Sequence, residues 1–275
     1  MATLVASYGD DSGGEPSSSP LQTSSFTPVQ GELLVVKAAS WSEFALLNTP
    51  TGGGLTYVER INSAPSSNCF TAIWTAEVTG SPGSMTVSCT LNGSSGYYAF
   101  VVERWSQAKL ASSPVLLSTG GSGAPNVNFT TTAANSRISI VNGDYNGQSG
   151  TATYRGTSTQ TFTYRSNGNF GYYGWYQTVA TASTVAVGMT APSSQKWRLA
   201  AIEILDNSAI EQDVDSVKES DVALSVSRGK RKVLGLVTGL SALLGLSKVK
   251  SHEVHVAEQA SALSVGKDKT HGVGA

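Results

Sequence analysis

Apolar residues recur through residues 1–205 in runs of strand length, and clusters of Gly, Ser, Thr and Asn separate the runs. Phe70–Val78 places apolar residues at every second position, which is the period of a strand with one buried face. Met85–Leu91 has the same period after the turn sequence Thr79–Gly83. Glu32–Ser40 is apolar with little alternation, which indicates a strand buried on both faces.

Further segments have strand length and composition, and nothing in the body has a convincing helical pattern. These segments are Tyr97–Trp105, Arg137–Val141, Thr161–Arg165, Phe170–Tyr176, Ser183–Met189 and Trp197–Leu205. Many short strands joined by glycine-rich turns are typical of a β-sandwich or jelly roll. We therefore expect an all-β, jelly-roll-like sandwich over residues 1–205.

A different kind of sequence follows this body. All 22 aromatic residues (5 Trp, 10 Tyr and 7 Phe) lie at or before Trp197. Residues 206–216 read as a polar linker, and residues 217–275 carry degenerate units in which an Ala-Leu step returns every 19 to 20 residues. A period in this range is typical of stacked or fibrous arrays. The apolar positions that we expect to drive assembly are Ala223, Leu224, Val226, Ala242, Leu243, Leu246, Ala262, Leu263 and Val265.

One such unit has too few aliphatic side chains to form a core alone, so it must stack on its neighbours or on other copies of the chain. We therefore hypothesise that copies of the chain assemble into a homotrimer through these units. Val233–Leu246 is a run of 14 uncharged residues, but a membrane helix needs about 20, so we expect an ordinary buried segment. Few aromatic residues and frequent charges also suit a flexible segment.

Composition narrows the partners further. The net charge is −1 and 13% of residues are charged, which leaves no basic field for nucleic acid. Met1–Ser7 lacks the basic start and the apolar length of a secretion signal. Cys69 and Cys89 have opposite parity on the predicted hairpin, so we expect two free thiols and no disulfide.

Catalytic chemistry has little support in the body. All three His (His252, His255 and His271) lie in the tail, so the body has no imidazole to activate a Ser or Cys nucleophile. The carboxylates that a glycosidase would need are present, but no spacing selects a pair. They are Glu59, Glu77, Glu103, Asp144 and Glu203. We expect neither enzymatic activity nor a cofactor.

Metal binding is also weakly indicated. Asp144, Asn146 and Gln148 alternate within Asn142–Gly150 in the manner of calcium ligands, but a glycine-rich hairpin loop is the simpler interpretation. The sequence His252-Glu253-Val254-His255 has no further ligands nearby. We expect no metal site.

The strongest ligand candidate is the aromatic segment Asn169–Gln177. Strand alternation would leave some of its rings on a surface, where they could stack on sugar rings or on a protein partner. For the segment as a whole, however, we favour core packing or a subunit interface. The candidate ligand-binding residues are Tyr172, Tyr173, Trp175 and Tyr176.

Four segments resemble the N-terminal β domain of minor tail proteins and related virion proteins of tailed phages that infect Actinobacteria. They are Ser25–Val36, Ala72–Val87, Ile138–Asn146 and Trp197–Leu205. The tail is similar to the degenerate repeats that often follow such domains, although its middle unit starts with Thr238-Gly239-Leu240 instead of an acidic residue.

This resemblance implies a structural virion protein, assembled in the host cytoplasm, at the tail tip or in a fibre. Its partners would be further copies of itself and other tail or capsid proteins, with a host-surface glycan as a further candidate. One alternative is a head-attached fibre or capsid decoration protein. A second, of a different class, is a carbohydrate-binding module.

Overall fold

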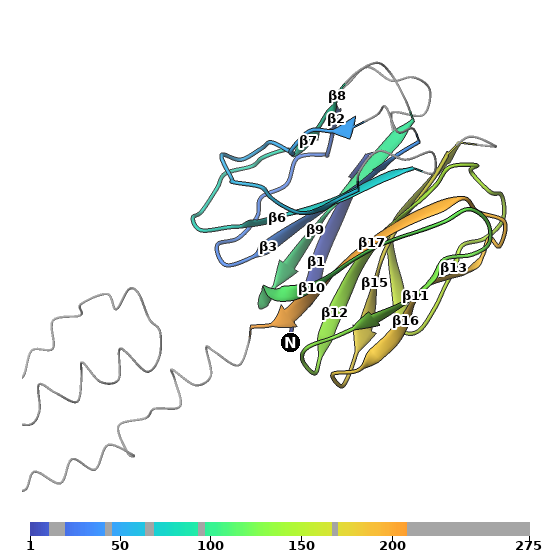
Figure 1. The fold of residues 1–275 in the computed structure, drawn as a ribbon. Coiled ribbons are helices and arrows are strands. Elements are labelled where there is room, and N and C mark those ends of the chain that lie inside the picture. The colour runs from blue at the N-terminus through green and yellow to red at the C-terminus, as the bar shows by residue number, and fades with distance from the viewer. Residues whose placement is uncertain (11–19, 42–45, 64–68, 93–96, 167–169, 208–275) are drawn as a thin grey trace, which may run out of the picture. The chain divides into compact units, whose positions relative to one another are not determined.

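A computed structural model describes residues 1–10, 20–41, 46–63, 69–92, 97–166 and 170–207 (Figure 1). Its regular structure in these ranges is entirely β, which confirms the all-β prediction. The chain divides into two units, Met1–Lys218 and Glu219–Ala275. The predicted repeats and their assembly residues lie outside the described residues, as do the three histidines.

Two five-stranded antiparallel sheets form the centre of the first unit. The first sheet runs β1 (Thr3–Asp10), β9 (Tyr98–Ser106), β3 (Leu33–Ser40), β6 (Phe70–Glu77) and β5 (Val58–Asn62). The second sheet runs β10 (Ala108–Gly120), β17 (Trp197–Asp206), β12 (Ser136–Asp144), β15 (Phe170–Val179) and β14 (Ser158–Ser166). Their facing sides enclose the central apolar core.

Smaller strands cover the outer face of each sheet, so the unit has four layers (Figure 1). The cover of the first sheet pairs β2 (Leu21–Gln22) with β7 (Ser88–Cys89) and β4 (Leu46–Leu47) with β8 (Leu91–Asn92). The cover of the second sheet runs β11 (Asn126–Thr130), β16 (Thr184–Ala191) and β13 (Thr153–Tyr154). The three inner strands of each large sheet are therefore buried on both faces.

This layering explains the sequence of β3. Leu33 and Val35 enter the core between the sheets, whereas Leu34 and Val36 enter the core under the outer cover. Because side chains alternate across a strand, two buried faces favour apolar residues at most positions, and in β3 only Lys37 and Ser40 are polar. The predicted doubly buried strand at Glu32–Ser40 is confirmed.

The two halves of the unit have the same topology. The order β1-β9-β3-β6-β5 becomes β10-β17-β12-β15-β14 when each strand is replaced by its counterpart in the second half. The ladders also match: a bulge interrupts β5 opposite Trp74 and Ile73, and a bulge interrupts β14 opposite Trp175 and Gly174, at the same register position.

The sheets also stack in reverse order. β1 lies against β14, β3 against β12 and β5 against β10, so an approximate two-fold axis passes between β3 and β12. Through these ladders, residues 33–40 match residues 137–144, residues 98–105 match 197–204, and residues 70–77 match 171–178. Within these matched residues Trp74 and Trp175 are the only identical pair, which explains why the duplication is invisible in the sequence.

Candidate functional site

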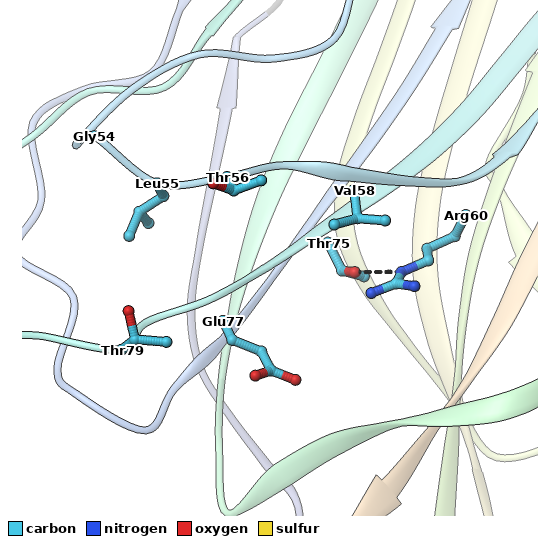
Figure 2. Close-up of a pocket in the computed structure, with 8 residues that line it drawn as sticks. All are labelled: Gly54, Leu55, Thr56, Val58, Arg60, Thr75, Glu77 and Thr79. Atoms are coloured by element: carbon cyan, nitrogen blue, oxygen red, sulfur yellow. Dashed lines mark hydrogen bonds between the residues drawn. The ribbon is translucent and has the colours of Figure 1, made fainter.

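A groove of about 400 Å³ opens beside the edge strand β5 (Figure 2). It is lined by Gly54, Leu55, Thr56, Val58, Arg60, Thr75, Glu77 and Thr79. Pockets that bind small molecules in proteins begin at about 300 Å³. The groove is therefore large enough to hold a small ligand.

Backbone geometry places the cation of this groove. The ladder passes from Glu59 opposite Trp74 to Ile61 opposite Ile73, so Arg60 is the extra residue of the β5 bulge. A bulge re-aims the side chain that it carries. The Arg60 Nε donates to Thr75 Oγ1 at 2.6 Å, which fixes the guanidinium along the groove (Figure 2). No sequence pattern indicates such a bulge, so Arg60 could not be identified as a site residue from the sequence.

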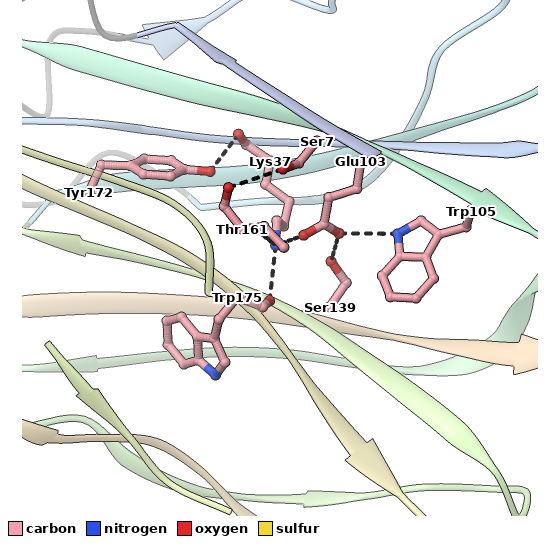
Figure 3. A network of polar contacts seen from close by, with 8 residues as sticks. All are labelled: Ser7, Lys37, Glu103, Trp105, Ser139, Thr161, Tyr172 and Trp175. Atoms are coloured by element: carbon pink, nitrogen blue, oxygen red, sulfur yellow. Dashed lines mark hydrogen bonds and ion pairs between the residues drawn. The ribbon is translucent and has the colours of Figure 1, made fainter. Parts of the chain in front are cut away.

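A buried polar network joins the two sheets and extends to the edge formed by β1 and β14 (Figure 3). The Lys37 ammonium forms an ion pair with Glu103 and donates to the carbonyl of Trp175 at 2.9 Å. Glu103 Oε2 also accepts from Ser139 Oγ at 2.7 Å and from Trp105 Nε1 at 3.2 Å. The carboxylate and the ammonium are thus satisfied by groups from both sheets.

The network is buried and ties the two sheets together. Both charged side chains have no exposed surface, and burial lowers the pKa of Lys37 while the nearby Glu103 raises it. Tyr172 donates its hydroxyl to the Lys37 carbonyl at 2.9 Å, which ties the second sheet to the first. Because its hydrogen bonds connect groups of both sheets, the network fixes how the sheets stack.

The other carboxylates that the sequence offered are placed separately. Glu203 is buried and accepts from the backbone N–H of Thr132 and from Ser136 Oγ, which caps the turn before β12. Asp144 accepts from the N–H groups of Asn146 and Gln148. Burial raises the pKa of Asp144, and these backbone hydrogen bonds lower it. Its oxygens hold the loop that had suggested a calcium site.

The aromatic segment is buried. Tyr172, Tyr173 and Trp175 have no exposed surface, and Tyr176 is partly buried against the central core. Tyr172, Tyr173 and Trp175 do not lie on a surface, so core packing accounts for these three rings. The reason is that β15 is covered on both faces, by the first sheet and by the β11-β16-β13 layer. Tyr172, Tyr173 and Trp175 are core residues.

A different aromatic group closes one end of the sandwich. The rings of Trp41 and Tyr145 stack with centroids 5.4 Å apart and planes 10° apart. These residues occupy matched positions after β3 and β12, and their backbone N–H groups donate to the carbonyls of the matched pair Tyr97 and Lys196. The stack therefore lies close to the approximate two-fold axis.

The remaining expectations concern cysteines, metals and membranes. Cys69 and Cys89 are both free and buried, and they enter different cores, as their opposite parity predicted. In the described ranges no cluster of His, Cys, Asp and Glu could hold a metal ion. The part of the chain that the structure describes contains no helix capable of crossing a membrane.

Comparison of the chain with protein-family models, with curated proteins and with solved structures finds no match in any of the three.

Proposed function

We propose that this chain is a structural protein of a tailed-phage virion, assembled in the host cytoplasm as a homo-oligomeric minor tail component. The observation that carries the proposal is the division of the chain into a self-contained double β unit and a separate repeat-bearing segment. The four segments that resemble minor tail proteins support the same class. In this proposal the chain is a building and binding part, not an enzyme.

The body has a direction that suits this role. β17 ends at Asp206, whose carboxylate lies 3.1 Å from the N-terminal ammonium of Met1. The Trp41–Tyr145 stack lies at the opposite end of the same sheets, because it follows the other ends of β3 and β12. We propose that the tail docks on the particle and that the aromatic end faces outward.

The buried carboxylates support a building part over a glycosidase. Glu103 is held in the Lys37 network and Glu203 caps a turn, so neither is free to act on a substrate. A head-attached fibre or a capsid decoration protein is the alternative location within the virion. A carbohydrate-binding module is the alternative class, and the groove beside β5 is the observation that favours it.

Two measurements test the proposal. Light scattering after gel filtration compares the full chain with a chain that ends at Lys218, and circular dichroism confirms that both are folded. We expect a trimer that becomes a monomer on truncation. A monomeric full chain would rule out the assembly role of residues 217–275. Absence of the chain from purified particles, judged by mass spectrometry, would contradict the virion assignment.

A further inference from the structure

The approximate two-fold axis makes the two long edges of the sandwich equivalent in topology, but they are packed differently. At the edge where β1 lies on β14, Trp105 and Tyr176 meet edge to face with centroids 5.1 Å apart. The bulge residue of β14, Thr161, lies 3.4 Å from the Lys37 ammonium, and its carbonyl accepts from Ser7 Oγ at 3.1 Å. This edge is filled by rings and satisfied polar groups.

At the matched edge, where β5 lies on β10, the two rings are missing. The position of Trp105 is taken by Ile204, and the position of Tyr176 is taken by Thr75. β10 also bulges here, since Leu110 pairs with Ile204 but the next pair is Val115 with Ile202. At this edge the side chains are therefore smaller and the edge strand β10 is displaced, and the groove lies along the same edge.

The lining of the groove combines three kinds of contact. Arg60 replaces Thr161 at the bulge position, and among the described residues its guanidinium uses only Nε, toward Thr75. Glu77 is exposed and forms no ion pair with Arg60. Leu55 and Val58 add aliphatic surface, and Val58 is 42% exposed. Donors, an acceptor and apolar carbon thus share one small space (Figure 2).

We propose that this groove is a binding site for a neutral saccharide. Sugar hydroxyls both accept and donate, so one ring can accept from the Arg60 guanidinium and donate to the Glu77 carboxylate. Its apolar face can rest on Leu55 and Val58. One cation and one anion in the lining of the same groove disfavour a ligand that carries charge of a single sign. The lining has no aromatic ring, so specificity rests on the polar groups.

This site goes beyond the structural role proposed above and does not depend on it, because its residues lie wholly within the first unit. A failed assembly measurement would leave the binding experiment unaffected, and the reverse also holds.

The test uses the full chain and an array of immobilised neutral saccharides built from glucose, galactose, mannose and N-acetylglucosamine. Saturation-transfer NMR with the same soluble sugars then measures affinity. We expect binding to at least one saccharide. Arg60→Gln and Glu77→Gln should each weaken it at least tenfold, because each removes a charge-assisted hydrogen bond. Thr75→Tyr, which restores the ring found at the filled edge, should abolish it.

Glu59→Gln is the matched control. Glu59 lies on the same strand, but it pairs opposite Trp74 and contacts Asn62 instead of the groove. This variant should bind within twofold of the unchanged chain. Thermal unfolding identifies any variant that fails to fold, and Glu77→Gln, at an exposed position, keeps the test valid if Thr75→Tyr does not. No binding to any neutral saccharide, or binding that survives both Arg60→Gln and Glu77→Gln, would overturn the proposal.

Discussion

The two halves of the body share one framework and differ in what they bury. Lys37 and Glu103 in the first half match Val141 and Ile202 in the second, so the same two positions hold an ion pair in one half and aliphatic side chains in the other. The alternation of apolar faces is kept, whereas the identities are not. A topology of this kind therefore requires buried faces in the right register and tolerates different chemistry at a given buried position.

The largest expected change in stability comes from removing one partner of the buried ion pair in the first half. Glu103→Ile leaves the Lys37 ammonium buried without its carboxylate, and we expect it to lower the free energy of unfolding by about 3–5 kcal/mol. The double change Lys37→Val with Glu103→Ile copies the second half. It should recover most of that loss, because a buried pair can be replaced by packed apolar residues at little cost.

Urea unfolding followed by tryptophan fluorescence measures both variants. Glu77→Gln is the control, since a change at an exposed carboxylate should stay within about 0.5 kcal/mol. If the double variant is as unstable as Glu103→Ile alone, the two halves do not accept the same core, and the ion pair is a requirement of the first half.

The strands with the clearest patterns could be predicted from the sequence. Glu32–Ser40 and Phe70–Val78 correspond to β3 and β6, and Trp197–Leu205 corresponds to β17. The patterns of β3 and β17 are strong because both faces are covered. β6 is also buried on both faces, but its second face carries Thr71 and Thr75, so its sequence indicated only one buried face. Edge strands were missed: β1, β5 and β10 border only one neighbour and carry mixed sequences. Because these strands pair with a neighbour on one side only, burial constrains their residues less, and their hydrophobic pattern is weak.

The groove and the duplication could not be predicted for a related reason. Arg60 is placed by a bulge, and Thr75 matters because of what its counterpart Tyr176 fills at the other edge. The first fact depends on a ladder irregularity between the consecutive strands β5 and β6, and the second relates strands far apart in the chain. The aromatic segment misled in the opposite way, because Tyr172 and Trp175 have the composition of a binding surface but lie under a cover layer. Composition alone cannot reveal that layer.

A second prediction uses pH to separate the halves. Thr23 in the first half and Thr131 in the second form equivalent hydrogen bonds, so they occupy matched positions. From this match, Cys89 in the first cover layer corresponds to Val185 in the second. Burial raises the pKa of Cys89 from 9.0 to about 12. Because the folded pKa is the higher one, this thiol stabilises the fold fully below pH 9, and the contribution is lost as pH rises toward 12.

From pH 8 to pH 10.5 this single group should lower the free energy of unfolding by about 2 kcal/mol. Cys89→Val, which copies the second half, should remove that part of the decline. The measurement is urea unfolding at both pH values for the two proteins. Lys37, whose pKa burial lowers, acts in the opposite direction in both proteins and cancels in the difference. An unchanged decline in the variant would show that Cys89 is not the group responsible.

The smallest expected effect concerns the contact that joins the halves at their axis. Trp41 and Tyr145 stack at matched positions, one from each half. A double-mutant cycle with Trp41→Ala and Tyr145→Ala should give a coupling energy of about 0.5–1.5 kcal/mol, the usual range for a stacked aromatic pair. Tyr154 of the second cover layer packs on Trp175. A control cycle that combines Tyr154→Ala with Trp41→Ala should be additive within about 0.5 kcal/mol.

The value of this cycle lies in what it says about cooperativity. The core between the sheets takes side chains from both halves, so neither half can bury its inner face alone. We therefore expect a single unfolding transition in every variant of the cycle, with the stacking energy visible in that one transition. Two separate transitions, with the Trp41 and Tyr145 effects confined to different ones, would mean that each half folds as its own domain and that the axis is only a contact surface.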